Sequence, residues 1–214
     1  MPPPNAGMMP GGIQVVHPYY KIVKGVPAAV VRSYKEPLYD SEVMLASDPD
    51  AEMVLYSRPV GQFLVDGVTR KTLLFTNQTQ AGALGTPLSF DLYAHNARLI
   101  GSLTTKTVTK GNYDLVFAAG VAQVVFGQDS VFLTVPLEDV PSGVDTEGLG
   151  ATDSPHIGLG VSENLYRFDI GGRALHINST ESYAVKISFP SGLSGTTGNL
   201  LFRWYMRGIK YKGV

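Results

Sequence analysis

The chain contains no cysteine, and only 16% of its 214 residues are charged. Without thiols it cannot form disulfide bonds, thiolate metal sites or a cysteine nucleophile. Lys and Arg (17) almost balance Asp and Glu (18), which argues against the strongly basic surface of a nucleic-acid-binding protein. No apolar run approaches the roughly 20 residues of a membrane-spanning helix. The hydrophobic content of 44% nonetheless predicts a folded core.

The sequence signatures of common enzyme classes are also missing. The stretch SGLSG at 191–195 has the wrong spacing for a G-x-S-x-G nucleophile elbow, and Gly158-x-Gly160 lacks the third glycine of a dinucleotide-binding loop. The four histidines are scattered along the chain: His17, His95, His156 and His176. We therefore predict no enzymatic activity, no catalytic residue, no cofactor, no metal site and no small-molecule substrate.

Glycine (24) and proline (14) are abundant instead, and they separate short apolar runs. The alternation of these runs and their content of Val, Tyr, Phe and Thr favour β-strands. Expected strands lie at 13–24, 28–35, 52–57, 60–66, 71–76, 88–94, 97–104, 112–118, 121–126, 129–135, 163–170, 173–178, 182–189 and 199–209. Helical periodicity is nearly absent, so at most one or two short helical turns are expected, the best candidate near 48–53.

Two segments depart from this pattern. Residues 1–12 hold four prolines, three glycines and three methionines without a charge, which predicts an extended arm. Residues 136–162 predict a long glycine-rich loop, and a single domain is expected over 13–214. The acids of this loop, which contains no Lys or Arg, are Glu138, Asp139, Asp145, Glu147 and Asp153. An acidic loop that faces solvent or a partner, a Ca²⁺ site and a disordered segment remain alternatives for it.

The last 33 residues, 182–214, have the opposite charge, with five Lys and Arg and no acid. Alternation predicts a core face formed by Leu200, Phe202, Trp204 and Met206. The opposite face bears Leu201, Arg203, Tyr205, Arg207 and Ile209. Arginines beside aromatics are enriched at interfaces, although cations that cover the exposed side of a central strand, or a weak nucleic-acid contact, would give the same pattern. The candidate assembly residues are Met1, Pro2, Pro3, Pro4, Met8, Met9, Arg203, Tyr205, Arg207, Lys210 and Lys212.

The arm MPPPNAGMMPGG, the strands over 13–209, the glycine-rich connections and the closing strand NLLFRWYMRGIKYKGV together resemble viral coat proteins of the jelly-roll kind. The resemblance implies an antiparallel β-sandwich of two four-stranded sheets whose terminal arm ties subunits together in the virion. Its partners would be copies of the chain and other coat proteins. The arm has no charge before Lys21, which argues against genome binding by the arm and fits a DNA phage better than an RNA virus.

Two further kinds of contact remain alternatives. The subunit could contact the genome or an internal membrane weakly, or the acidic loop of one subunit could contact the basic C-terminus of its neighbour through complementary charge. The main alternative function is a carbohydrate-binding or adhesin-like β-sandwich, such as a phage tail, fibre or decoration domain. Its sugar-stacking residues would be Tyr19, Tyr20, Tyr34, Tyr39 and Trp204. A cupin-like enzyme would require clustered histidines, which the spacing does not support.

Overall fold

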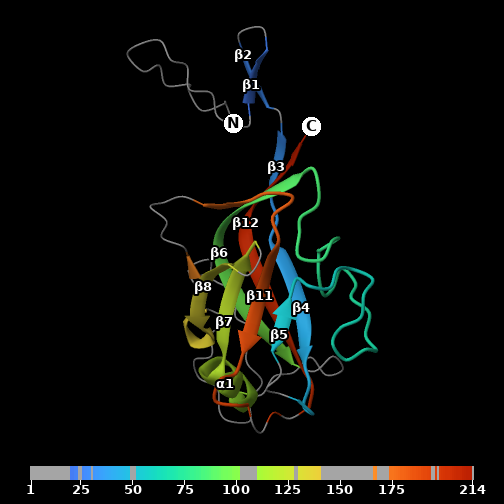
Figure 1. Cartoon of the computed structure of the whole chain (residues 1–214), viewed down its shortest axis with the longest axis vertical. Coiled ribbons are helices and arrows are strands. Elements are labelled where there is room, and N and C mark those ends of the chain that lie inside the picture. Colours follow the sequence, from blue (N-terminus) through green and yellow to red (C-terminus); the bar gives the residue numbers. More distant parts are fainter. Residues whose placement is uncertain are drawn as a thin grey trace.

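Figure 1 shows the chain as a computed structural model. The structure describes residues 20–23, 26–29, 31–48, 52–101, 110–127, 130–140, 166–167, 174–193, 196 and 198–213. The predicted arm at 1–12 and residues 141–162 of the predicted acidic loop lie outside these ranges.

Strands dominate the described part of the chain. They are β1 (Tyr20–Val23), β2 (Val26–Ala29), β3 (Val31–Lys35), β4 (Leu38–Met44), β5 (Met53–Leu55), β6 (Leu88–Gly101), β7 (Val121–Phe126), β8 (Ser130–Pro136), β9 (Tyr166–Arg167), β10 (Leu175–Ile177), β11 (Tyr183–Ser188) and β12 (Leu200–Gly213). The helical elements are α1 (Lys110–Ala119) and the short 3₁₀ helix η1 (Leu137–Asp139).

Two long antiparallel strands, β6 and β12, form the centre of the larger sheet. The other edge of β12 pairs with β4 and then with β3, while β9 and β10 pair with the outer edge of β6. The second sheet has the order β5–β11–β7–β8, again antiparallel throughout. β1 and β2 form a separate antiparallel pair.

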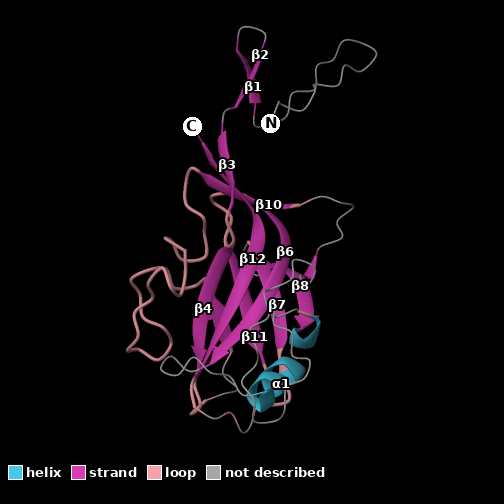
Figure 2. Cartoon of the chain, turned by 180° about the vertical axis from the view of Figure 1, so that it is seen from behind, coloured by secondary structure: helices cyan, strands magenta, loops and turns pink. Residues whose placement is uncertain are grey.

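The two sheets pack face to face around one hydrophobic core, and α1 lies at one end of them (Figure 2). Phe202 and Trp204 of the larger sheet and Val185 and Ile187 of the second sheet are fully buried in this core. The predicted all-β sandwich is therefore confirmed. The predicted core face of β12 is buried in all four of its members: Leu200, Phe202, Trp204 and Met206.

Helix α1 overturns the predicted strand at 112–118. Tyr113 stacks on Phe117, one helical turn away, with ring centroids 4.3 Å apart. Val116 and Phe117 are buried against the core, so the apolar residues at 113, 116 and 117 follow a helical spacing. The apolar run is long enough to form either a strand or a helix. The helix is the form that packs against the end of the sandwich.

The predicted strands at 60–66 and 71–76 are also wrong, because this region is an irregular loop. Gly61 and Gly67 adopt φ values of 93° and 69°, which turn the backbone back on itself. The loop then bonds to itself, with the N–H of Leu64 donating to Thr69 O and that of Lys71 donating to Gln62 O.

Three other sequence predictions differ from the structure. The expected strands at 88–94 and 97–104 are one continuous strand, β6. Strand β4 was not predicted, because Asp40, Ser41 and Glu42 interrupt its apolar pattern. The helical turn expected near 48–53 is not seen where the chain is described, since Asp48 pairs with Leu45 in an isolated bridge and Met53 begins β5; residues 49–51 lie outside the description.

Candidate assembly surface

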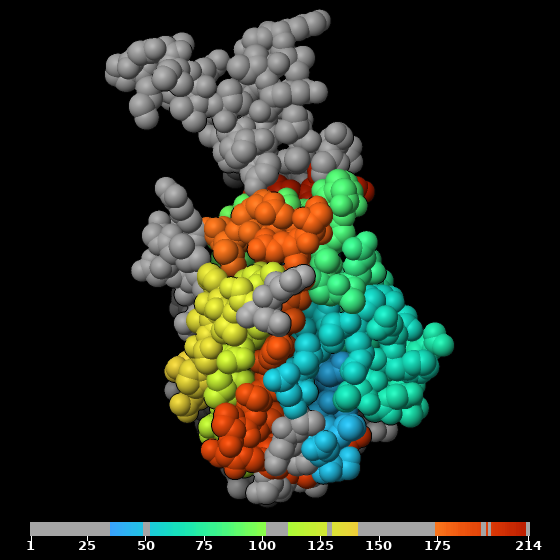
Figure 3. All heavy atoms as spheres, viewed as in Figure 1, coloured from blue at the N-terminus to red at the C-terminus, as the bar shows by residue number. Residues whose placement is uncertain are grey.

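A segment of 32 residues, 56–87, connects β5 to β6, and we call it the long loop. It lies beside β4 and bulges from the side of the sandwich (Figures 1 and 3). Its return segment is hydrogen-bonded to β4: the Asn77 N–H donates to Tyr39 O, and the Tyr39 N–H donates to Asn77 Oδ1 at 3.0 Å. The Ser41 hydroxyl donates to Phe75 O at 2.8 Å. The long loop is thus fixed along the edge of the larger sheet.

A buried cluster of charges fixes the long loop a second time. Lys71 Nζ lies 2.9 Å from both Oδ1 and Oδ2 of Asp40, and both side chains are 0% exposed. The same Nζ lies 3.4 Å from Oε2 of Glu42, which also accepts a hydrogen bond from Arg58 Nη1 at 3.0 Å. Oε1 of Glu42 accepts the N–H of Val65 at 2.7 Å. Two acids of β4 therefore hold two cations and two backbone amides, those of Tyr56 and Val65, of the long loop.

The charge of Asp40 is shaped by its surroundings. Burial raises the pKa of Asp40 above its ordinary value, and the Lys71 ammonium lowers that pKa in part. The N–H of Tyr56 donates to Oδ2 at 2.6 Å. Tyr56 has a φ of 67°, an uncommon conformation for a residue other than glycine. The chain is thus bent at Tyr56, where it presents an N–H to a buried carboxylate.

The outer face of β12 brings together three of the predicted assembly residues. The Arg203 guanidinium lies 5.9 Å from the Tyr205 ring centre, and that of Arg207 lies 4.6 Å from the same ring. Arg203 also donates to Ser41 Oγ at 2.7 Å and to Leu74 O, while Arg207 donates to Asn96 Oδ1 at 2.8 Å. The arginines are partly buried, and Arg203 holds the long loop.

The other predicted site residues do not join this group. Lys210 pairs with Glu36 at 3.3 Å towards the end of β12, and Lys212 is exposed there. Glu138 and Asp139 are exposed on η1. The remaining predicted residues lie outside the described ranges: Met1, Pro2, Pro3, Pro4, Met8, Met9, Asp145, Glu147 and Asp153.

Sequence reasoning missed a set of exposed apolar side chains, which we call the loop apolar set. All of them belong to the long loop: Val60, Phe63, Val65, Val68, Leu73 and Leu74. Val68, Leu73 and Leu74 are 79%, 68% and 59% exposed. All of them except Val68 lie in the runs at 60–66 and 71–76, which predict two strands from the sequence. Large contiguous apolar patches are typical of interaction sites, so this set is a candidate for one.

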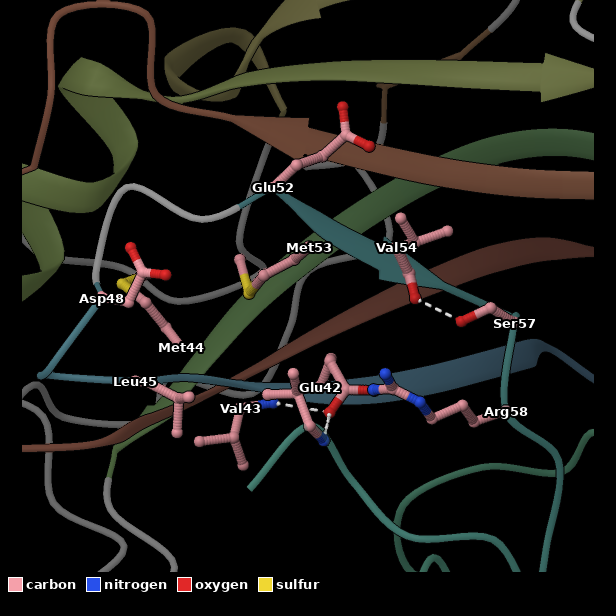
Figure 4. A pocket seen from close by; sticks show the side chains of 11 residues that line it. Glu42, Val43, Met44, Leu45, Asp48, Glu52, Met53, Val54, Ser57 and Arg58 are labelled. Atoms are coloured by element: carbon pink, nitrogen blue, oxygen red, sulfur yellow. Dashed lines mark hydrogen bonds and ion pairs between the residues drawn. The ribbon is translucent and has the colours of Figure 1, made fainter. Parts of the chain in front are cut away.

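A small pocket lies between β4, β5 and the start of the long loop (Figure 4). Its volume is about 100 Å³, well below the roughly 300–1,000 Å³ of small-molecule sites. Arg58 reaches across one side of it to Glu42. This pocket suits a few waters rather than a substrate.

The two histidines of the described ranges lie in different environments. Trp204 Nε1 donates to Nδ1 of His95 at 3.0 Å, and burial lowers the pKa of His95 to about 3. Nδ1 of His176 lies 2.6 Å from Oδ1 of Asp91, whose Oδ2 accepts the Tyr211 hydroxyl at 2.8 Å. Across these ranges, no group of three His, Asp or Glu residues is placed to hold a metal ion.

A helix long and apolar enough to cross a bilayer is not found among the residues that the structure describes. No protein-family model matches the chain, and neither curated proteins nor solved structures give a match.

Proposed function

We propose that the chain is a jelly-roll structural subunit of a virus particle, where it assembles with copies of itself or with other coat proteins. The pairing of eight strands of the two sheets supports the jelly-roll topology, while β3 and β9 add further pairing to β12 and β6. In chain order the eight strands are β4, β5, β6, β7, β8, β10, β11 and β12. The first pairs with the eighth, the second with the seventh, the third with the sixth and the fourth with the fifth.

This nested pairing is that of one long antiparallel hairpin rolled into two sheets. The hairpin turns between β7 and β8, and its two ends meet at β4 and β12. Jelly rolls are eight-stranded double sheets of Greek-key type, and they occur in viral capsids, lectins and cupins. The topology therefore fits a coat protein, but function has to be argued from the surface.

The observation that carries the proposed assembly role is the loop apolar set. Its side chains are exposed on a loop that the buried ions hold against the sandwich. A surface fixed before binding loses less conformational entropy when a partner covers it. The arrangement suits a permanent contact between subunits.

The sugar-binding alternative has weaker support. Trp204, one of its predicted stacking residues, is fully buried. Tyr39, another of them, donates its hydroxyl hydrogen to Leu73 O, and Arg203 lies 5.6 Å from its ring centre. Both residues are thus engaged inside the chain rather than offered as an open aromatic platform.

Electron microscopy and light scattering of the purified full-length chain test the proposal. We expect particles or large oligomers from the native sequence, and loss of assembly with a folded monomer from the double variant Leu73→Ser with Leu74→Ser. Val131→Ser on β8 is the matched control, since Val131 is apolar and 49% exposed but lies away from the long loop. A monodisperse native monomer at high concentration, or equal losses in both variants, would contradict the assembly role.

The two predicted interface elements require a separate test. Deletion of residues 1–12 is expected to weaken assembly without unfolding the subunit. The double variant Arg203→Glu with Arg207→Glu is expected to impair assembly. Because Arg203 holds the long loop, part of this loss is expected to come from displacement of that loop. An unchanged particle yield after both changes would leave the loop apolar set as the remaining contact.

A further inference from the structure

The contact between Lys71 and Asp40 holds an amine nitrogen directly against a buried carboxylate. Lys71 Nζ is equidistant from the two carboxylate oxygens, at 2.9 Å from each. An atom so placed lies close to the carbon between the oxygens, within the roughly 3–3.5 Å of a near-attack arrangement. Both side chains are 0% exposed, so water is excluded from the pair.

We propose that Lys71 and Asp40 condense spontaneously into an intramolecular amide bond, with Glu42 as the group that transfers the proton. The inference concerns the subunit itself and does not depend on the assembly role proposed above. An amine and a carboxylic acid react slowly in water, because both are charged at neutral pH. A dry site that holds them in contact favours their neutral forms and removes the entropic cost of the encounter.

The reaction balances without an oxidant or a co-reactant. One proton first passes from the Lys71 ammonium to the Asp40 carboxylate, which leaves a neutral amine and a neutral acid. The amine nitrogen then bonds to Cγ of Asp40, and a tetrahedral intermediate forms. Glu42 accepts a proton from that nitrogen and returns it to the departing hydroxyl. One C–O bond breaks, one C–N bond forms and one water molecule leaves.

Burial and two neighbouring groups favour these steps. Burial raises the pKa of Asp40, which favours the acid form that the reaction needs. The N–H of Tyr56, 2.6 Å from Oδ2, is placed to stabilise the oxyanion of the intermediate. Oε2 of Glu42 lies 3.4 Å from Lys71 Nζ, which is within reach for proton transfer as the nitrogen attacks.

Glu42 is held in position for this role. Arg58 binds Oε2 at 3.0 Å, and the N–H groups of Val43 and Val65 donate to Oε1. The resulting bond would join residues 31 positions apart and close a covalent ring that runs from β4 through β5 to the middle of the long loop. The part of the long loop inside this ring, 56–71, contains no helix or strand, so the bond would supply a constraint there that secondary structure does not.

The mass of the denatured full-length chain tests the proposal directly. We expect the native sequence to be lighter than its calculated mass by one water molecule. Digestion with chymotrypsin separates Asp40 from Lys71, because Tyr56 and Phe63 lie between them, and a branched peptide that contains both residues is expected. A chain of full calculated mass would overturn the proposal, whatever its stability.

Variants identify the bond. Lys71→Arg keeps the positive charge but removes the amine nucleophile, so its full mass is expected. Asp40→Asn is expected to lose ammonia instead of water, and Glu42→Gln is expected to condense at least tenfold more slowly after refolding, which follows from the usual size of proton-transfer catalysis. Unchanged kinetics in Glu42→Gln would overturn the role of Glu42.

Two comparisons within the chain control for other dehydration reactions. The dipeptide Asp66-Gly67 can lose water by cyclising, but it is intact in Lys71→Arg, so a water loss that persists in this variant overturns the proposal. Lys210 and Glu36 are also paired, at 3.3 Å, but the Glu36 side chain is 40% exposed. We expect no branched peptide from this pair, because its site is not dry.

Discussion

Replacing Lys71 by methionine measures how strongly the buried charges stabilise the subunit. In Lys71→Met, the carboxylate of Asp40 is left buried without its cation. In the double variant Asp40→Asn with Lys71→Met, a neutral amide takes its place, and the carbonyl of that amide can still accept the Tyr56 N–H. Neither variant can form a bond between positions 40 and 71, and Arg58 remains on Glu42 in both. Their difference in stability therefore isolates one buried charge.

The expected size of this difference follows from the contacts of Asp40. Removing one partner of a buried ion pair costs about 3–5 kcal/mol, because the remaining charge is uncompensated. The Tyr56 N–H, at 2.6 Å, still stabilises that charge in Lys71→Met, so the lower end of the range applies. We expect the double variant to be more stable than Lys71→Met by about 3 kcal/mol at neutral pH. For a chain of this length that corresponds to roughly 6–12 °C in Tm.

The difference should also depend on pH. Burial raises the pKa of Asp40 in the folded state above its ordinary value of 3.8, and loss of Lys71 raises it further, because the ammonium had lowered it. The folded state of Lys71→Met therefore binds the proton more tightly than the unfolded state, so its stability increases as pH falls through the raised pKa. The advantage of the double variant shrinks over this interval and vanishes only below pH 3.8, where Asp40 is protonated in the unfolded state as well.

Urea unfolding followed by tryptophan fluorescence measures both effects. The chain has one tryptophan, and Trp204 is fully buried, so its emission reports on unfolding of the core. Equal stabilities of the two variants at neutral pH would refute the assigned cost of the buried carboxylate. A difference that stays constant from pH 8 to pH 5 would refute its electrostatic origin.

Three further outcomes are expected. Because burial lowers the pKa of His95 from 6.5 to about 3, native stability should fall below pH 6.5 by up to about 1.4 kcal/mol per pH unit, and His95→Gln should reduce this slope in urea unfolding. Gly208→Ala would place a Cβ against Asp91 O and should lower Tm strongly, whereas Gly111→Ala, with open space in α1, should gain about 0.5–1 kcal/mol. Association through the loop apolar set should survive about 0.5 M salt in light scattering, whereas dissociation there would favour contact between the acidic loop and the basic C-terminus.

Alternation was a sound guide wherever one face of a strand meets the core. The four inward residues of β12 and the alternating burial of β11 follow from period-two patterning, because burial there is one-sided. The same rule failed at β4, whose inward positions include Asp40 and Glu42 between Leu38 and Met44. Polar residues at these positions are stable only because the long loop supplies their partners.

The partners of β4 could not be found from local sequence. Asp40 and Lys71 are 31 residues apart, and no recurring spacing connects them. The apolar runs at 60–66 and 71–76 have the composition of strands. They form a loop instead, because Gly61 and Gly67 have positive φ values and Lys71 is paired with the buried Asp40. The candidate surface was therefore missed for the same reason as the buried cluster, since both depend on contacts between distant segments.

The few charged residues of the chain include four in the long loop, and their contacts relate the low charge to the candidate surface. The long loop has only four charged residues: Arg58, Asp66, Arg70 and Lys71. Arg58 and Lys71 bind the acids of β4, Asp66 accepts the N–H groups of Val68 and Thr69, and Arg70 lies 4.8 Å from the Phe63 ring centre. Arg58, Asp66 and Lys71 thus fix the backbone that carries the loop apolar set, while Arg70 is exposed beside Phe63 as the one cation on this surface of the long loop. A partner that covers this surface would meet apolar side chains and desolvate few ions, which is the property expected of a contact between subunits that stays closed.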